Sequence, residues 1–263
     1  MSRQPEVGEI PEHAAKDLKQ VEKDLDEAEA EILKYSARLH DPIFAKRDVV
    51  LEKIDKFWPQ ALTNCVSTNV YIDDDDHALL DSVTKIAVKR DVNDPRAATI
   101  EFHFAPNDFI HDTVLVKEFK LDPKAGPFSA QFDFASETIP QPTTIQWKSD
   151  EKNLSKRKPT VGDLKEIKEG EEDAEDEEED DFEPGSFFSS FFDSQSRQVA
   201  GSIGQAIVED LYPNAVQHYE SPSLYEDEDE EEDDEEDEED EDDDDREIDL
   251  EEEEKRPKKK SRK

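Results

Sequence analysis

The cysteine and the histidines have the most reactive side chains in this sequence, and they are scattered along it. Cys65 is the single cysteine. It would need a neighbouring base to act as a nucleophile, and no local signature of one accompanies it. His103 and His111 could meet across a hairpin and hold a metal ion, but histidines on the surface of a strand are the simpler interpretation.

The motifs of the common catalytic and metal sites do not occur in the 263 residues. The phosphate-binding patterns GxGxxG and GxxxxGK[ST] are missing, as are HExxH and CxxC. Carboxylates are abundant, but abundance does not supply a pair with tuned pKa values. The four acids Asp73–Asp76 lack the glycine and the distal glutamate of an EF-hand, so they fit better as the start of a short helix from His77 to about Val83. We expect no enzyme, no cofactor and no metal.

Charge is the dominant property of the chain. It has 74 Asp and Glu against 33 Lys and Arg, for a formal net charge of -41. Residues 226–254 contain 26 acids and one arginine, and 171–183 contain 11 more acids. Such a polyanion repels nucleic acid and anionic membranes and attracts basic partners, most strongly at moderate salt. Its line charge, about one per 3.3 Å of extended chain, is weaker than the one per about 1.7 Å of DNA. A basic cargo would therefore be shielded by this chain and then released to DNA.

Residues 255–263 form a basic cluster after the acidic run. The cluster is typical of a nuclear localisation signal, for which Lys258, Lys259, Lys260, Arg262 and Lys263 are the candidate residues, and it could also pair with the acidic run. Importin is the partner that such a signal implies. No apolar run is long enough to span a bilayer, and the first residues lack the apolar stretch of a signal peptide. A single cysteine fits a reducing compartment. We therefore expect a nuclear protein, with shuttling to the cytoplasm left open.

A strict heptad pattern predicts one long helix from Glu12 to His40, about 43 Å in length. Pro42 is expected to end it, and Asp41-Pro42 to begin a second helix. The helix is polar on every face but one, so its apolar stripe needs a partner. The stripe could pack on its own domain, but we favour pairing with a second copy, because closed two-fold dimers are the commonest oligomers. The expected dimerisation residues are Leu18, Val21, Leu25, Ala28, Ile32, Tyr35 and Leu39.

The following residues predict an α+β domain with an antiparallel sheet covered on one face. Alternating apolar residues indicate strands around 86–88, 100–104, 114–121 and 145–147, with a further strand or a loop around Phe128–Phe134. Residues 149–184 lose periodicity and predict a mobile insertion. The aromatic segment 185–193 is expected to return to the core, followed by a helix with Val199, Ile203, Ile207 and Leu211 on its apolar face. We expect a flexible N-terminus at 1–11, a dimerisation helix at 12–41, a domain at 42–225 and a disordered acidic tail at 226–254.

The ordered series of segments resembles the SET / nucleosome assembly protein (NAP) family, in particular its SET (template-activating factor) branch. No single segment is decisive, but their order through most of residues 12–225 is specific. Besides the heptad helix, the segments are Phe44–Arg47, Lys56–Pro59, Ile100–Phe104, Asn107–Phe109, Leu115–Phe119, Ile145–Lys148, Ser186–Phe188, Glu209–Asn214 and His218-Tyr219. The chain departs from SET-like members in the aromatic segment, which lacks a tryptophan, and in Ser194–Val208, which contains no acid.

The resemblance implies a homodimeric histone chaperone that promotes nucleosome assembly and chromatin remodelling. Its paired helices would carry two "earmuff" domains, and acidic surfaces would bind both core-histone pairs, the tetramer-forming and the dimer-forming one, with little direct binding of DNA. The expected histone-binding residues are Asp181, Glu183, Ser189, Asp193, Glu209, Asp210, Glu220, Glu226, Asp227, Glu228 and Asp229. An alternative is an acidic inhibitor or cofactor of an enzyme, such as a phosphatase inhibitor or a histone acetyltransferase partner. A calcium buffer would need a lumenal address, which the basic cluster argues against.

Overall fold

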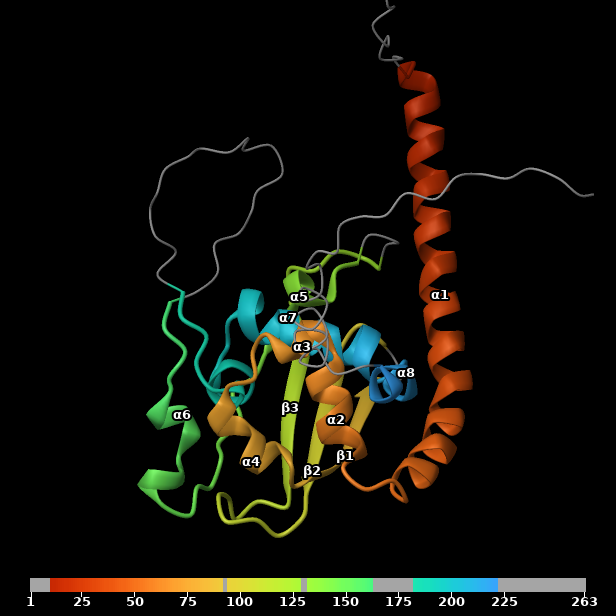
Figure 1. Ribbon diagram of the computed structural model, residues 1–263. Helices are drawn as coiled ribbons and strands as arrows, with labels where there is room; N and C mark the ends of the chain where they lie inside the picture. The colour runs from red at the N-terminus through yellow and green to blue at the C-terminus, as the bar shows by residue number, and fades with distance from the viewer. Residues whose placement is uncertain (1–9, 92–93, 129–131, 163–181, 222–263) are drawn as a thin grey trace, which may run out of the picture. The chain divides into compact units, whose positions relative to one another are not determined.

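A computed structural model of the chain describes residues 10–91, 94–128, 132–162 and 182–221. The expected acidic tail and localisation segment lie outside these residues. The first element is α1 (Glu12–Leu51), the long helix at the side of Figure 1. Among the described residues, no helix is both long and apolar enough to cross a membrane.

The expected break at Pro42 is wrong, because α1 continues through it for nine more residues. Proline removes one backbone donor, which leaves the carbonyl of the exposed Arg38 free to face water. Contacts of Phe44, Arg47 and Asp48 with Tyr212 then fix the following two turns to the domain. The helix ends before Lys56, whose φ of 51° turns the chain into α2 (Phe57–Asn64). Pro59 lies in the first turn of α2, where no intrahelical donor is required.

The four acids Asp73–Asp76 form a capped turn, as the sequence indicates. Asp73 caps the 3-10 helix η1 (Asp74–Asp76), which leads into α4 (His77–Leu80). Asp76 is fully buried, and its carboxylate accepts hydrogen bonds from the Ser186 hydroxyl and the Phe187 amide. Asp76 thereby ties this turn to the aromatic segment.

The sheet is an antiparallel meander in the order β1-β2-β3-β4. Its strands are β1 (Val83–Arg90), β2 (Ala98–Phe104), β3 (Val114–Leu121) and β4 (Thr138–Pro140). Burial alternates along β2, where Ile100, Phe102 and Phe104 face inward. The predicted strand around Ile145 is wrong. Only Trp147 makes an isolated bridge there, to Ile110, while Ile145 is buried and Trp147 packs on Phe188.

Helical segments cover one face of the sheet (Figure 1). They comprise α3 (Val66–Asn69), α5 (Phe134–Glu137), η2 (Asp150–Lys152), α6 (Leu154–Arg157), η3 (Phe188–Asp193), η4 (Arg197–Gly201), α7 (Ser202–Gln205), η5 (Ala206–Leu211) and α8 (Ala215–Glu220). Phe134 therefore begins a short helix rather than a strand. The return of the aromatic segment to the core is confirmed, since Phe187, Phe188, Phe191 and Phe192 are all fully buried.

The mobile insertion predicted at 149–184 is wrong for its first part. Residues 150–157 form η2 and α6, and Leu154 is buried in the core. Residues 163–181 lie outside the described residues. The basic start of this segment misled the prediction, because Arg157 and Lys158 are held by ion pairs to Asp75 and Asp73.

Candidate functional site

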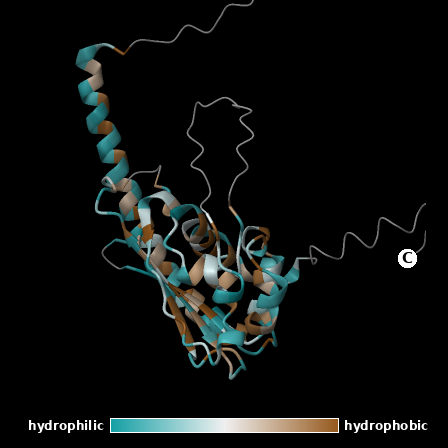
Figure 2. Ribbon diagram, turned by 90° about the vertical axis from the view of Figure 1, so that its left-hand side faces the viewer, coloured by the Kyte–Doolittle hydropathy of each residue, from teal (hydrophilic) through white to brown (hydrophobic). Residues whose placement is uncertain are grey.

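The apolar stripe of α1 faces solvent in the single chain. Its large residues Leu18, Val21, Leu25, Ile32, Tyr35 and Leu39 are 43–60% exposed, and Ala28 is also exposed. Figure 2 shows α1 as a mostly teal helix with separate brown positions along it. The opposite interpretation, that the stripe packs on its own domain, does not fit these exposures. We call the surface formed by these seven residues the α1 seam.

A different face of α1 attaches the helix to its own domain. Arg47 donates a hydrogen bond to the Tyr212 carbonyl at 2.5 Å, and its guanidinium lies over the Phe44 and Tyr212 rings. The Tyr212 hydroxyl donates to the Asp48 carboxylate at 3.1 Å. Burial and the charge of Asp48 together raise the pKa of Tyr212, so this hydroxyl stays protonated and keeps donating. The helix is thus held with the α1 seam pointing away.

Exposed apolar residues continue along α1 beyond Pro42. Ile43, Val49 and Val50 are each more than half exposed. They lie on the part of the helix that the sequence assigned to a separate element. The apolar surface available for pairing therefore reaches the end of the helix.

The acidic residues expected to bind histones differ in whether the structure describes them and in where they lie. Glu183, Asp193, Glu209 and Glu220 are exposed. Asp181 and the four residues 226–229 lie outside the described part of the chain. Glu183 pairs through its backbone with Val161, while Glu209 lies on η5 and Glu220 ends α8. These side chains come from separate segments, and no described contact joins them into one cluster.

Ser189 is not available as a surface residue. Its side chain is buried, and its hydroxyl hydrogen-bonds to the Lys158 and Ser186 carbonyls and to the Thr160 hydroxyl. Because its hydroxyl is engaged inside the domain, Ser189 is a poor candidate for histone binding. The sequence alone could not show that Ser189 is buried, because serine occurs both in protein interiors and on protein surfaces.

Asp193 lies at the end of η3 beside a buried lysine. The ammonium group of Lys117 on β3 donates to the carbonyls of Phe192 and Ser194, at 3.2 and 2.7 Å. Burial lowers the pKa of Lys117 to about 7, although the nearby Asp193 opposes the shift. Asp193 is exposed as a residue, but its carboxyl is partly desolvated against the domain, which raises the pKa of Asp193 against the opposing charge of Lys117. Lys117 thus satisfies the C-terminal carbonyls of η3 from inside the domain.

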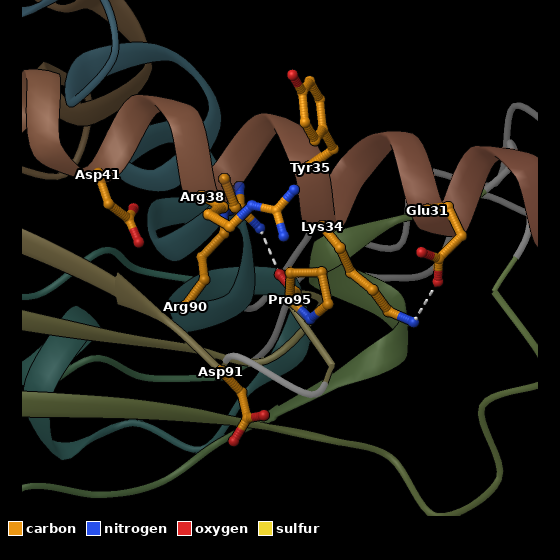
Figure 3. Close-up of a pocket in the computed structure, with 9 residues that line it drawn as sticks. Glu31, Lys34, Tyr35, Arg38, Asp41, Arg90, Asp91 and Pro95 are labelled. Carbon is orange, nitrogen blue, oxygen red and sulfur yellow. Dashed lines mark hydrogen bonds and ion pairs between the residues drawn. The ribbon is translucent and has the colours of Figure 1, made fainter.

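A pocket lies between α1 and the β1–β2 connection (Figure 3). It has a volume of about 500 Å³, and its charged lining residues are Glu31, Lys34, Arg38, Asp41, Arg90 and Asp91. Arg90 donates to the Pro95 carbonyl at 2.8 Å, and Lys34 pairs with Glu31 at 3.0 Å. Acids and bases balance in this lining, and it includes neither a histidine nor a cysteine. The pocket therefore offers no nucleophile with an adjacent base.

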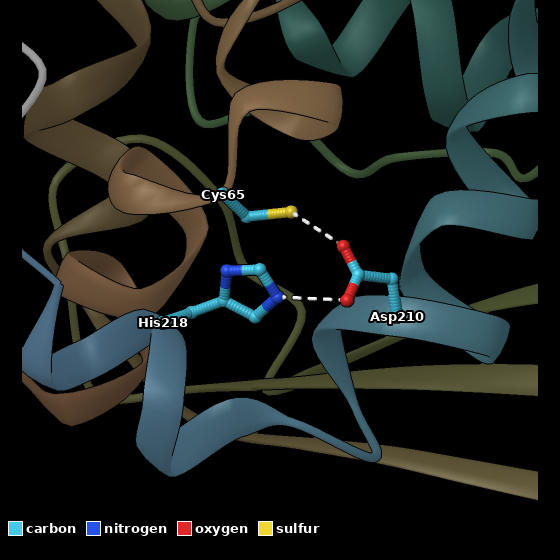
Figure 4. Close-up of side chains that lie close together, drawn as sticks. All are labelled: Cys65, Asp210 and His218. Atoms are coloured by element: carbon cyan, nitrogen blue, oxygen red, sulfur yellow. Dashed lines mark hydrogen bonds and ion pairs between the residues drawn. The ribbon is translucent and has the colours of Figure 1, made fainter.

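Three side chains that are distant in the sequence meet at the junction of α2 and α3 (Figure 4). The Asp210 carboxylate accepts from His218 Nε2 at 3.0 Å, from Asn214 at 3.1 Å and from the Cys65 thiol at 3.9 Å. Burial opposes ionisation of Asp210, but the bonds from Asn214 and His218 outweigh it and lower the pKa of the carboxyl. Asp210 thus has partners inside the domain, which the sequence did not reveal, and it is a poor candidate for histone binding.

The comparisons with known proteins agree with the resemblance seen in the sequence. The family model described as nucleosome assembly protein (NAP) matches residues 19–255. Protein SET of Drosophila melanogaster is 29% identical over 224 residues, covering 84% of this chain and 71% of that protein. A Schizosaccharomyces pombe protein named for nucleosome assembly is 32% identical over 214 residues, covering 78% and 79% respectively.

The fold is also found among solved structures. The crystal structure of Ccp1 matches with a TM-score of 0.57 at 26% identity, covering 79% of this chain and 94% of that chain. The long N-terminal helix and the four-stranded antiparallel sheet confirm the expected fold class. Because the family model spans most of the 263 residues, the chain belongs to the nucleosome assembly protein (NAP) family.

Proposed function

We propose that this chain is a homodimeric histone chaperone that binds both core-histone pairs and promotes nucleosome assembly and chromatin remodelling. The proposal rests on the chain's membership of the NAP family together with the chain's large negative charge. Histones are polycations, and the 26 acids of residues 226–254 supply a matching polyanion. Its weaker line charge compared with DNA allows the histones to be handed over rather than retained.

The exposed side chains of the folded domain would add to this binding. Glu183, Asp193, Glu209 and Glu220 are the described acids that we propose to contact histones, with Asp181 and residues 226–229 contributing from outside the described part. Individual exposed ion pairs contribute only about 0–1 kcal/mol each. Affinity must therefore come from many pairs at once, which is why the acidic run is the main element of the proposal.

The α1 seam supports a dimer of such domains. A stripe of six large apolar residues on a helix anchored to the domain by another face needs a covering surface. A second α1 offers the same heptad spacing, so the two stripes can interdigitate. We propose that two copies pair through this helix and so present two acidic domains and two acidic tails.

The domain organisation follows from these parts. We propose pairing through residues 12–41, extended by the remainder of α1, a histone-binding domain up to about residue 225, an acidic tail at 226–254 and a nuclear localisation segment at 255–263. The last segment would bind importin and place the protein in the nucleus. A role as inhibitor or cofactor of a phosphatase or a histone acetyltransferase stays a prediction of the sequence, and no described contact favours it.

A salt titration of histone binding tests the proposal. The full chain should bind each of the two purified core-histone pairs at about physiological ionic strength, with an affinity that falls steeply as salt is added. A variant with the acids of 226–254 changed to their amides keeps the length of the tail and removes its charge. It should bind more weakly at low salt and show a flatter dependence on salt.

Two outcomes separate the parts of the proposal. If the full chain binds neither histone pair at that ionic strength, the proposed function is wrong. If it binds both but the amide variant has the same affinity at every salt concentration, the function stands and the role of the tail is wrong. A matched control changes Lys258, Lys259 and Lys260 to glutamine, which alters charge in the neighbouring segment but removes no acid.

A further inference from the structure

The cluster of Cys65, Asp210 and His218 combines the three ligand types that zinc prefers. Cys65 lies between α2 and α3, Asp210 on η5 and His218 on α8. Their sulfur, oxygen and nitrogen atoms all lie within 4.8 Å of one another. Among the residues that the structure describes, this is the one group of three or more potential metal ligands. Figure 4 shows the three side chains pointing toward a common space.

The distances are close to those of a tetrahedral ion. With Zn–S of about 2.3 Å and Zn–N and Zn–O of about 2.0–2.2 Å, tetrahedral ligand atoms lie about 3.3–3.6 Å apart. His218 Nε2 lies 3.0 Å from one oxygen of the Asp210 carboxylate, and the Cys65 sulfur lies 3.9 Å from the other. The three ligand atoms lie within 4.8 Å of one another, so they must approach by up to about an ångström to surround a tetrahedral ion. The half-exposed Asp210 lets an ion approach from solvent and leaves a fourth position open to water.

The backbone around the cluster holds the ligands in place. The Cys65 amide donates to Ala61, and its carbonyl accepts from the Thr68 and Asn69 amides. The neighbouring Asn64 side chain donates to the His218 carbonyl at 2.9 Å. The Phe57 and Tyr219 rings stack at 4.7 Å on the same pair of helices. The ligands therefore sit on segments that pack together without an ion, which lowers the cost of assembling a site.

A nucleophilic role fits the arrangement less well. An activated cysteine needs a histidine or another base next to its sulfur. Here the carboxylate lies between the thiol and the imidazole, and the thiol donates to it. Burial raises the pKa of the Cys65 thiol, which disfavours a free thiolate. A bound cation would remove this obstacle, because a coordinated thiol loses its proton.

We propose that Cys65, Asp210 and His218 bind one Zn²⁺ ion through Sγ, a carboxylate oxygen and Nε2, with water as the fourth ligand. Binding releases the thiol proton to solvent. The proton that Nε2 of His218 donates to Asp210 in the ion-free chain also leaves to solvent, and the neutral imidazole that binds the ion carries its single proton on Nδ1. The ion links α8 and η5 to the α2–α3 junction. Because protons compete with the metal for these atoms, affinity rises with pH.

Cobalt titration of the reduced full-length chain tests the site. The acids of the chain bind divalent cations weakly but give no charge-transfer band, whereas a Co²⁺–thiolate bond does. The chain has a single cysteine, so any such band reports Cys65. We expect the band to appear in the native chain and to disappear when Zn²⁺ is added.

Variants at the two other ligands decide whether the cluster is the site. His218→Gln and Asp210→Asn should each weaken Co²⁺ binding at least about tenfold, since even an outer partner of a metal site costs that much. The control His111→Gln, at an exposed histidine outside the cluster, should leave the Co²⁺ affinity unchanged. Absence of the band, or a band with native affinity in both ligand variants, overturns the proposal. Neither result depends on histones, so this site and the proposed function fail separately.

Discussion

Replacing Leu25 with aspartate should separate the proposed dimer into monomers. Leu25 is 60% exposed in the single chain, so pairing would remove more than half of its surface from water. Full burial of a leucine contributes about 1.5–3 kcal/mol, which gives about 1–2 kcal/mol for each copy and about 2–4 kcal/mol for both. At 1.4 kcal/mol per factor of ten, this loss alone raises the dimer Kd about 30-fold to 700-fold.

The introduced carboxylates increase the effect beyond the lost burial. In a symmetric pairing each copy brings its own new carboxylate into a partly dry interface, where a charge without a partner is costly. Adding Ile32→Asp, at a position that is 59% exposed, removes a second apolar burial of similar size from each copy and increases the free-energy loss further.

Sedimentation equilibrium over a wide concentration range measures the change directly. The domain should keep its melting temperature, because neither side chain is buried in the protomer. Helical circular dichroism should fall on dissociation, since the free N-terminal half of α1 is marginal as a single helix. Gln20→Glu adds one negative charge per copy at an exposed position off the seam and serves as the control. An unchanged dimer in the double variant would refute the assignment of the seam.

Two further predictions concern the stability of the folded domain. Gly204→Ala places a Cβ 2.3 Å from Cζ of Phe119. Such overpacking costs about 1–3 kcal/mol, so the melting temperature should fall. The control Gly126→Ala, with no atom within 4 Å of its Cβ, should leave the melting temperature unchanged, and equal melting temperatures for the two variants would contradict the packing of α7 on β3. Burial lowers the pKa of Lys117 to about 7 in the fold, against 10.5 for the free side chain. Between these two pH values the unfolded chain binds more protons than the folded chain. The free energy of unfolding should therefore rise with pH in this range, by up to about 1.4 kcal/mol per pH unit. Urea unfolding of native and Lys117→Met chains from neutral to alkaline pH measures this, and parallel profiles would show that Lys117 does not titrate in this way.

The sequence by itself determined the features that depend on local periodicity. The heptad spacing from Leu18 to Leu39 repeats with the pitch of a helix, so it predicts both α1 and the face that stays exposed. The alternation of Ile100, Phe102 and Phe104 likewise predicts the covered face of β2. The family resemblance rested on such segments in their order, and the match over residues 19–255 confirms it.

Long-range packing decided what the sequence could not. Proline normally ends a helix, yet α1 passes Pro42 because residues beyond it are fixed by Tyr212, from the far end of the domain's sequence. Lysine normally faces water, yet Lys117 points inward because the end of η3 presents carbonyl groups that need a donor.

The cluster at the α2–α3 junction shows most clearly that the sequence alone does not reveal long-range contacts. Cys65 and Asp210 are separated by 145 residues, and only the docking of η5 and α8 against α2 brings their side chains together. Periodicity reports which face of an element is buried, because burial follows the geometry of one helix or strand. It carries no information on which buried faces meet, since that depends on the free energy of packing the whole chain.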